Sequence, residues 1–322
     1  RPLPIGGVSI IAFALTVLTK TVPMEKAIVG FGNASIWMIA MAFFIARGFI
    51  KTGLGRRIAL NFVKAFGKRT LGLAYSLIGV DLIFAEYHGD MITAAMFMTA
   101  MAANPLVQTL AKSNGVNITW VGWFLAALVP GIISLIIVPW LIYKMYPPEI
   151  KETPNAKQWA EDELSKMGAM TLPEKLMAVI FVIALVLWIV GSFIGIDATL
   201  AAFIALGLLL FCGVLSWQDV LHETGAWNTL TWFSVLVMMA GQLTTLGFIP
   251  WLSKTVGNSL HGMNWILVLV ILIIAYFYSH YLFASSTAHV TAMYSAFLAV
   301  AISAHVPPML AALMLGFFGN LM

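Results

Sequence analysis

The sequence predicts an all-α polytopic membrane protein, organised as an inverted repeat with re-entrant hairpins. Hydrophobic residues make up 61% of the 322 residues and charged residues only 9%, whereas a soluble domain carries about 25% charged residues. Long segments such as Asn264–Leu282 and Val290–Ala304 contain no Asp, Glu, Lys or Arg, as is typical of membrane helices. The chain has room for roughly ten spans of about 20 residues each.

Two membrane helices and one interfacial helix are predicted at the start of the chain. The membrane helices cover Ile5–Val22 and about Ser35–Lys51. The interfacial helix covers Leu54–Phe66, where apolar residues recur every four positions and the basic residues lie off that stripe. Positions 47–69 hold Lys and Arg but no acidic residue, so the positive-inside rule makes them cytoplasmic. The alternative, a basic surface for nucleic acid, is disfavoured by the flanking apolar helices.

The next apolar segment, Thr70–Ala85, is short for a span, and the polar run Glu86–Asp90 follows it directly. Three apolar segments separate the basic stretch from the next Lys-rich region. If all three crossed the membrane, these two regions would lie on opposite sides, against the positive-inside rule. We therefore expect that a hydroxyl-rich hairpin tip and its returning arm are absent between Ala85 and Glu86.

Prolines divide the stretch that follows. A helix over Met91–Ala103 is expected to break at Asn104-Pro105. Trp120–Tyr143 is a full span, predicted to be interrupted at Pro130 and closed near Pro139.

The only extended hydrophilic segment, residues 144–175, is expected to be a cytoplasmic linker between two halves. The second half is predicted to contain three spans, at Leu176–Ile194, Ala198–Leu215 and Trp227–Leu246. A short interfacial piece is predicted at Phe248–Val256, and a last helix at Met309–Met322.

The two halves repeat one order of features. Trp37 corresponds to Trp232, and Gly53-Leu54 corresponds to Gly247-Phe248. An interfacial helix follows each pair, and then a short apolar arm that ends in L-I-F-A or L-F-A. With the absent arm restored, the copies run in opposite directions, which places solute sites near the bilayer midplane.

This repeat predicts five segments. They are a scaffold part of the first copy with its interfacial helix (1–69), a transport part of the first copy with an incomplete hairpin (70–143), the linker (144–175), a scaffold part of the second copy (176–258), and a transport part of the second copy with a hairpin tip at 284–289 (259–322).

A polar cluster interrupts the apolar chain within Tyr281–His289. Three hydroxyl residues, Ser285, Ser286 and Thr287, stand between two apolar arms, and polar groups inside a membrane commonly mark a solute path. Ser285 or Ser286 is placed to cap the departing arm, whose free N–H groups attract carboxylates. Two facing tips would hold one carboxylate each, which favours a dicarboxylate ligand.

His289 follows in the first turn of the departing arm. We interpret it as a positive charge where a sodium-coupled carrier would place a cation. A histidine that only hydrogen-bonds a neighbouring carbonyl is the open alternative. Asn104 either lines the same site or marks a simple kink, and His280 and Tyr278 are expected to pack.

An intramembrane hydrolase that uses Ser285 or Ser286 with His289 is a remote alternative. No Gly-rich elbow precedes the serines and no oxyanion hole is evident, so we predict no catalytic residue. The single cysteine, Cys212, lies in an apolar helix. No metal-ligand cluster is visible, and we expect neither a metal nor another cofactor.

Five motifs carry a family resemblance: T-G-L-G-R-R-I-A-L (Thr52–Leu60), G-K-R-T-L (Gly67–Leu71), W-L-I-Y-K-M-Y-P-P-E (Trp140–Glu149), W-A-E-D-E-L-S-K-M-G (Trp159–Gly168) and A-W-N-T-L (Ala226–Leu230). Together they resemble the divalent-anion:sodium symporter family. The branch they resemble contains citrate/tartrate:succinate antiporters and plastid 2-oxoglutarate/malate translocators. The resemblance covers essentially the whole chain.

The resemblance implies a homodimer whose transport domain moves against a scaffold, an elevator mechanism. It implies two Ser-Asn-Thr tips that bind carboxylates. Ser285-Ser286-Thr287 matches the second tip with Ser in place of Asn, and the first tip has no match. Asn104 matches an Asn-Pro pair near the first site, and a second broken helix is expected after Met322.

The expected function is sodium-independent exchange of C4–C5 dicarboxylates such as succinate, malate and 2-oxoglutarate. A sodium-coupled dicarboxylate or citrate symporter is the alternative, and sodium binds only in that case. The expected partners are small di- or tricarboxylates, membrane lipid and a second copy of the chain, without nucleic acid. The expected location is the cell membrane (inner or plasma), crossed several times.

Overall fold

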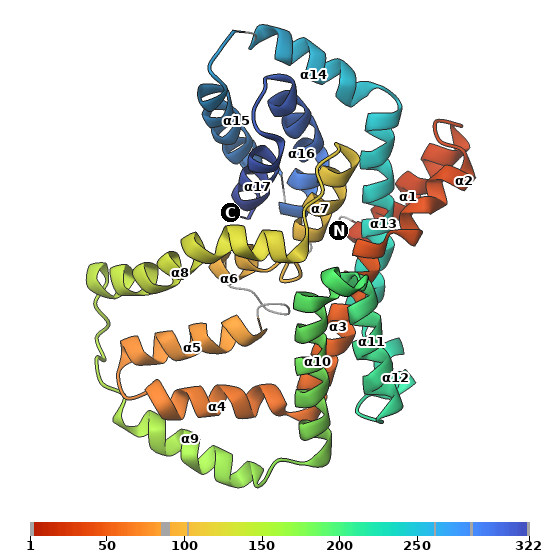
Figure 1. The fold of residues 1–322 in the computed structure, drawn as a ribbon. Helices are drawn as coiled ribbons and strands as arrows, with labels where there is room; N and C mark the ends of the chain where they lie inside the picture. Colours follow the sequence, from red (N-terminus) through yellow and green to blue (C-terminus); the bar gives the residue numbers. More distant parts are fainter. Residues whose placement is uncertain (1–2, 85–90, 102, 261, 284–285, 321–322) are drawn as a thin grey trace. The chain divides into compact units, whose positions relative to one another are not determined.

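The computed structural model describes residues 3–84, 91–101, 103–260, 262–283 and 286–320 (Figure 1). Every regular element in these ranges is a helix, and one isolated antiparallel bridge joins Arg69 and Glu152. The prediction of an all-α polytopic membrane protein is therefore confirmed. Two expected features lie outside the described residues: the junction of Ala85 and Glu86, and Ser285.

The chain divides into two compact units. Unit 1 contains residues 1–40, 101–123 and 224–322, and unit 2 contains residues 41–100 and 124–223. Helices α3 (Ala34–Thr52) and α8 (Trp120–Met145) contribute residues to both. The predicted scaffold and transport segments use other boundaries and stay a prediction.

Helix α16 (Ser286–Ser303) is the centre of one part of unit 1. The helices packed against it are α7 (Ala103–Ser113), α14 (Phe248–Ser259), α15 (Trp265–Ser279) and α17 (Pro308–Phe318). A short 3-10 helix, η2 (His280–Leu282), continues α15 towards the start of α16. The Tyr294 hydroxyl of α16 donates to the Ala312 carbonyl of α17 at 2.9 Å, which joins the middle parts of these two helices.

The rest of unit 1 packs on α13 (Thr224–Thr245). The elements in contact with it are α1 (Ile5–Leu18), α2 (Met24–Ala27) and η1 (Ile28–Gly32). A Cβ atom at Gly30 would lie 2.1 Å from the Ser234 carbonyl oxygen. Only glycine therefore permits this close approach of η1 to α13.

Unit 2 contains the predicted linker, residues 144–175, and the predicted interfacial helix. Helix α4 (Leu54–Phe66) packs against α5 (Thr70–Phe84) and α9 (Pro154–Met167), and α10 (Leu172–Ile194) packs against α11 (Ala198–Phe211). The remaining helices are α6 (Met91–Met96) and α12 (Trp217–Leu221). The predicted bounds of the amphipathic helix α4 are confirmed, and it buries Leu54 and Leu60.

Five helices of the described chain are long and apolar enough to cross a membrane: Ala34–Thr52, Trp120–Met145, Leu172–Gly191, Trp265–Leu282 and Ser286–Ser303. The pair α13 and α14 passes the same test together but is bent by 60°. Four shorter apolar helices accompany these spans, including α1 and α17. The described chain is thus a multi-pass arrangement, although fewer full spans occur in it than the roughly ten for which it has room.

Two proline predictions are wrong. Helix α8 runs without interruption through Pro130 and Pro139, because neighbouring groups can satisfy the few backbone bonds that a proline frees in an apolar helix. The chain between α6 and α7 leaves the helical conformation at Phe97–Met101, before Asn104-Pro105. Pro105 lies instead in the first turn of α7, where a proline costs no helical hydrogen bond.

Candidate functional site

The start of α16 is the candidate site, and three of the predicted residues lie on it. Ser286 is the first residue of the helix and is buried, with 7% of its surface exposed. Ser285, the residue before it in the sequence, lies outside the described residues. Thr287 is partly buried, and its carbonyl accepts a hydrogen bond from the Thr291 hydroxyl at 2.6 Å. The first N–H groups of a helix are free to bind an anion.

His289 lies one turn further along α16 and is fully buried. Its Nε2 atom is 2.9 Å from the Ser279 Oγ, and that Oγ donates to the Tyr276 carbonyl at 2.8 Å. The serine hydroxyl has one hydrogen, so both contacts are satisfied when His289 Nε2–H donates to Ser279. The lone pair of neutral His289 is then on Nδ1. The Ser279 hydroxyl is thus one partner of His289, and the role of His289 as a positive charge stays a prediction.

Aromatic rings surround His289. Their centroids lie 4.2 Å away for Tyr276, 4.8 Å for His280 and 5.3 Å for Phe283. His280 is itself buried, with 6% of its surface exposed. From the sequence, His280 was predicted only to pack, and Tyr276 was not predicted to lie near the site. One feature of the sequence could have indicated the contact between the two histidines: His280 precedes the hydroxyl cluster and His289 follows it.

The remaining predicted residue, Asn104, is buried in the first turn of α7. Its Oδ1 accepts a hydrogen bond from the Asn320 Nδ2 at 2.8 Å. The Asn104 side chain therefore connects α7 to the chain after α17, and α7 packs against α16. Asn320 is a buried polar residue that the sequence analysis missed.

The remote hydrolase alternative requires a serine bonded to His289. Within the described residues, His289 Nε2 contacts Ser279, and Nδ1 has no hydrogen-bond partner. Ser286 thus makes no bond to either ring nitrogen. Ser286 therefore does not form the nucleophile–base pair that a serine hydrolase needs, and Ser285 lies outside the described residues.

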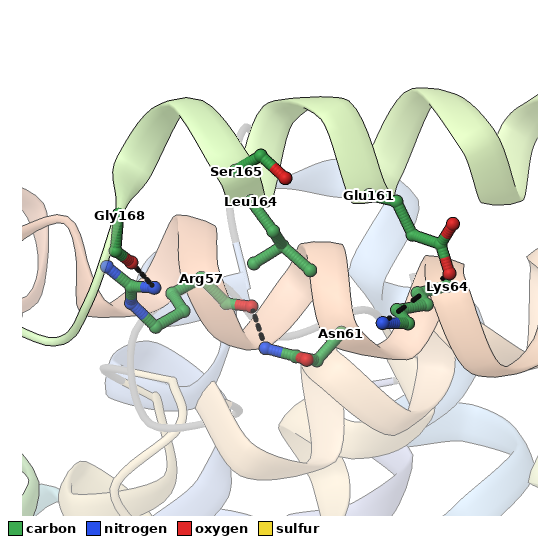
Figure 2. A pocket seen from close by; sticks show the side chains of 7 residues that line it. All are labelled: Arg57, Asn61, Lys64, Glu161, Leu164, Ser165 and Gly168. Carbon is green, nitrogen blue, oxygen red and sulfur yellow. Dashed lines mark hydrogen bonds and ion pairs between the residues drawn. The ribbon is translucent and has the colours of Figure 1, made fainter.

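A second polar region lies between α4 and α9 in unit 2, as Figure 2 shows. It is an open groove whose charged groups pair with each other. Arg57 donates to the Gly168 carbonyl at 2.8 Å, and Lys64 lies 3.5 Å from Glu161. On the same helix α9, the hydrogen bond from Lys166 lowers the pKa of Glu163. Since its charges are already matched, we interpret this groove as the attachment of the linker to the interfacial helix.

Arg57 also forms the most buried ion pair of the described chain. Its Nε atom donates to Glu174 at 2.8 Å, and the side chains of Arg57 and Glu174 are only 12% and 2% exposed. Glu174 additionally completes a capping box with Thr171 at the start of α10. This ion pair therefore holds the end of the predicted linker, at Glu174, against α4.

We expect Arg57→Ala to lower the free energy of unfolding by about 3 kcal/mol, because it leaves the buried Glu174 carboxylate without its partner. Denaturant unfolding of the purified protein in detergent measures this change. Arg56→Ala is the matched control, since Arg56 pairs with Glu163 but is 63% exposed, and exposed pairs contribute little. Equal losses for the two variants would contradict the role assigned to Arg57.

Comparison with known proteins adds a family and several relatives. The family model described as the sodium:sulfate symporter transmembrane region matches residues 1–88 and 82–322. YflS of Bacillus subtilis, which carries a provisional name as a malate transporter, is 48% identical over all of this chain and 77% of its own length. Dicarboxylate transporter 1 of spinach chloroplasts is 42% identical over all of this chain and 65% of its own length.

The citrate/succinate antiporter of Escherichia coli is 33% identical over 84% of this chain. This chain spans 64% of that antiporter's length. The alignment with the Bacillus protein runs over 366 positions, which is 44 more than the 322 residues of this chain. The relatives thus contain residues that have no counterpart here, and the family match is divided at residues 82–88.

Proposed function

Because the chain belongs to the divalent-anion:sodium symporter family, we propose that it is a secondary carrier that exchanges C4–C5 dicarboxylates across the cell membrane. Its relatives are named as dicarboxylate or malate transporters and as a citrate/succinate antiporter, which supports small carboxylates as substrates. The names of these relatives describe transporters and not enzymes. The multi-pass helices and the bacterial relatives support a location in the cell membrane.

The observation that carries the proposal is the polar cluster at the start of α16. Ser286 and His289 are buried at the N-terminus of an otherwise apolar helix. Hydroxyl and N–H donors in this position bind a carboxylate without the cost of a permanently buried charge. Ser285, Ser286, Thr287 and His289 are the proposed substrate ligands, and Asn104 on the adjacent α7 is the fifth.

The proposed mechanism is an elevator motion. The residues 70–143 and 259–322 form the moving part in this proposal, while 1–69 and 176–258 form the scaffold of a homodimer. The repeat predicted from the sequence motivates it, and the two corresponding tryptophans, Trp37 and Trp232, lie on helices α3 and α13. Each of these helices is followed by a shorter helix, α4 or α14. In the proposal, α15 and α16 are the two arms of a re-entrant hairpin.

Exchange without sodium is preferred over sodium-coupled symport because His289 supplies a titratable group beside the proposed carboxylate. The description of the family model favours the alternative, a sodium-coupled symporter. In that alternative a cation would share the start of α16 with the substrate. The two carriers differ in what drives uptake, so one experiment separates them.

The experiment is uptake of labelled succinate into proteoliposomes that contain the purified protein. We expect uptake in sodium-free buffer that depends on internal succinate or malate, and none in protein-free liposomes. Uptake that requires sodium and no internal anion would replace exchange with symport. A protein that neither binds nor carries any dicarboxylate would overturn the proposed function.

A further inference from the structure

Most of the buried side-chain polar atoms without a hydrogen-bond partner in the described residues gather at one place. They are the Tyr276 hydroxyl, both ring nitrogens of His280, and Nδ1 of His289. Two more such atoms occur elsewhere in the described chain, on Ser295 and Asn320. Because a buried polar group without a partner is costly, a cluster of four such atoms calls for an explanation.

The two histidines belong to different arms and are in contact with each other. His280 is in η2, at the end of α15, and His289 is in the first turn of α16. Their ring centroids are 4.8 Å apart, so two positive charges would repel each other strongly. The pair can therefore accept at most one proton beyond its neutral state. The free nitrogens of His280 and Nδ1 of His289 are the atoms that can take it.

Among the described helices that pack on this pair, no acidic side chain balances that proton. The described helices packed around α15 and α16 are α7, α13, α14 and α17, and none contains Asp or Glu. Their only charged side chains are Lys112 and Lys254, both exposed. The other titratable groups nearby are tyrosines: Tyr294 is bonded to Ala312, whereas Tyr278 and Tyr281 are exposed. A positive charge on the histidine pair is thus balanced by no carboxylate of these described helices.

We propose that His280 and His289 form a two-histidine proton site that becomes charged only when a dicarboxylate occupies the start of α16. Each dianion is then bound together with one proton. This inference rests on the proposed function and goes beyond it, because it names the coupled ion and adds His280 as a proton-binding residue. The pair binds one proton, and the substrate carboxylate compensates its charge.

The test measures proton uptake when succinate binds to the purified protein in weakly buffered detergent solution with a pH-sensitive dye. We expect about one proton per bound succinate near neutral pH. By linkage, the affinity for succinate then falls roughly tenfold for each pH unit above neutrality. Binding titrations from about pH 6 to about pH 8.5, which bracket an ordinary histidine, measure that slope without requiring transport.

His280→Gln and His289→Gln are each expected to remove most of the proton uptake and to flatten the pH dependence at least threefold. His222→Gln is the matched control, since this exposed histidine on the other unit bonds only to the Gln218 carbonyl. The thermal unfolding midpoint of each variant shows whether it is folded. A folded His280→Gln protein with an unchanged pH slope would overturn the role of His280.

Proton uptake by the wild-type protein is measured without any variant, and this measurement by itself can exclude the proton site. Succinate binding without proton uptake would exclude the two-histidine proton site and leave dicarboxylate binding intact. Absence of any dicarboxylate binding would overturn the proposed function, and the proton site with it.

Discussion

Insertion of the extra segment of the Bacillus relative between Ala85 and Glu86 is expected to raise succinate exchange at least tenfold. The alignment with this relative is 44 positions longer than the chain, and the family match is divided at residues 82–88. We expect that segment to carry the hydroxyl-rich tip that the sequence predicts to be absent between Ala85 and Glu86. One hydrogen bond to a carboxylate contributes about 1.5–3 kcal/mol, so regaining a single bond already gives a tenfold change.

The matched control for this insertion is a Gly- and Ser-rich segment of equal length at the same position. It restores the spacing of the chain but offers no defined tip. Exchange rates are measured in the same proteoliposomes at equal protein content. If both insertions raise exchange equally, spacing and not a second carboxylate-binding tip explains the effect. If neither insertion raises exchange, the expectation that a carboxylate-binding tip is missing between Ala85 and Glu86 is wrong.

Ser286→Ala is expected to lower the affinity for succinate by about tenfold to a hundredfold. The hydroxyl is buried at the first position of α16, where the proposal places one carboxylate of the substrate. Loss of one hydrogen bond to a charged group costs about 1.5–3 kcal/mol. Succinate titration of the purified variant measures the change directly.

Ser303→Ala is the matched control, because it removes the same atom from the opposite end of the same helix. The Ser303 hydroxyl donates to the Val300 carbonyl and is exposed, so we expect no change in affinity. A Ser286→Ala variant that binds succinate as the wild type does would remove Ser286 from the proposed site. Thr287 and His289 would then be the remaining proposed ligands among the described residues of α16.

Much of the fold could be predicted because membrane helices depend on composition. The bounds of α4 agreed with the amphipathic pattern over Leu54–Phe66, and α3 agreed within one residue of Ser35–Lys51. The prolines were less informative. Pro130 and Pro139 do not end α8. A proline removes one backbone hydrogen bond of the helix, and surrounding groups can satisfy the carbonyl that it frees, so the helix can continue.

The candidate site was predicted only in part. Ser286, Thr287, His289 and Asn104 all belong to unit 1, as expected from residues that share one site. The sequence analysis did not find that His280 contacts His289, nor that Asn104 is bonded to Asn320. Asn104 and Asn320 are far apart in the chain, and no periodicity within a helix indicates which residues meet across two helices.

The sequence by itself determined that the protein is a multi-pass helical membrane protein with a hydroxyl cluster before His289. Long apolar segments leave few alternatives, since backbone groups in a bilayer must be satisfied within each segment. Only the tertiary structure decided what surrounds that cluster. The packing of α15 on α16 buries His280 beside His289 and gives His289 Nε2 a serine partner. These contacts depend on the relative placement of two helices, which is set by side-chain packing and not by local sequence preference.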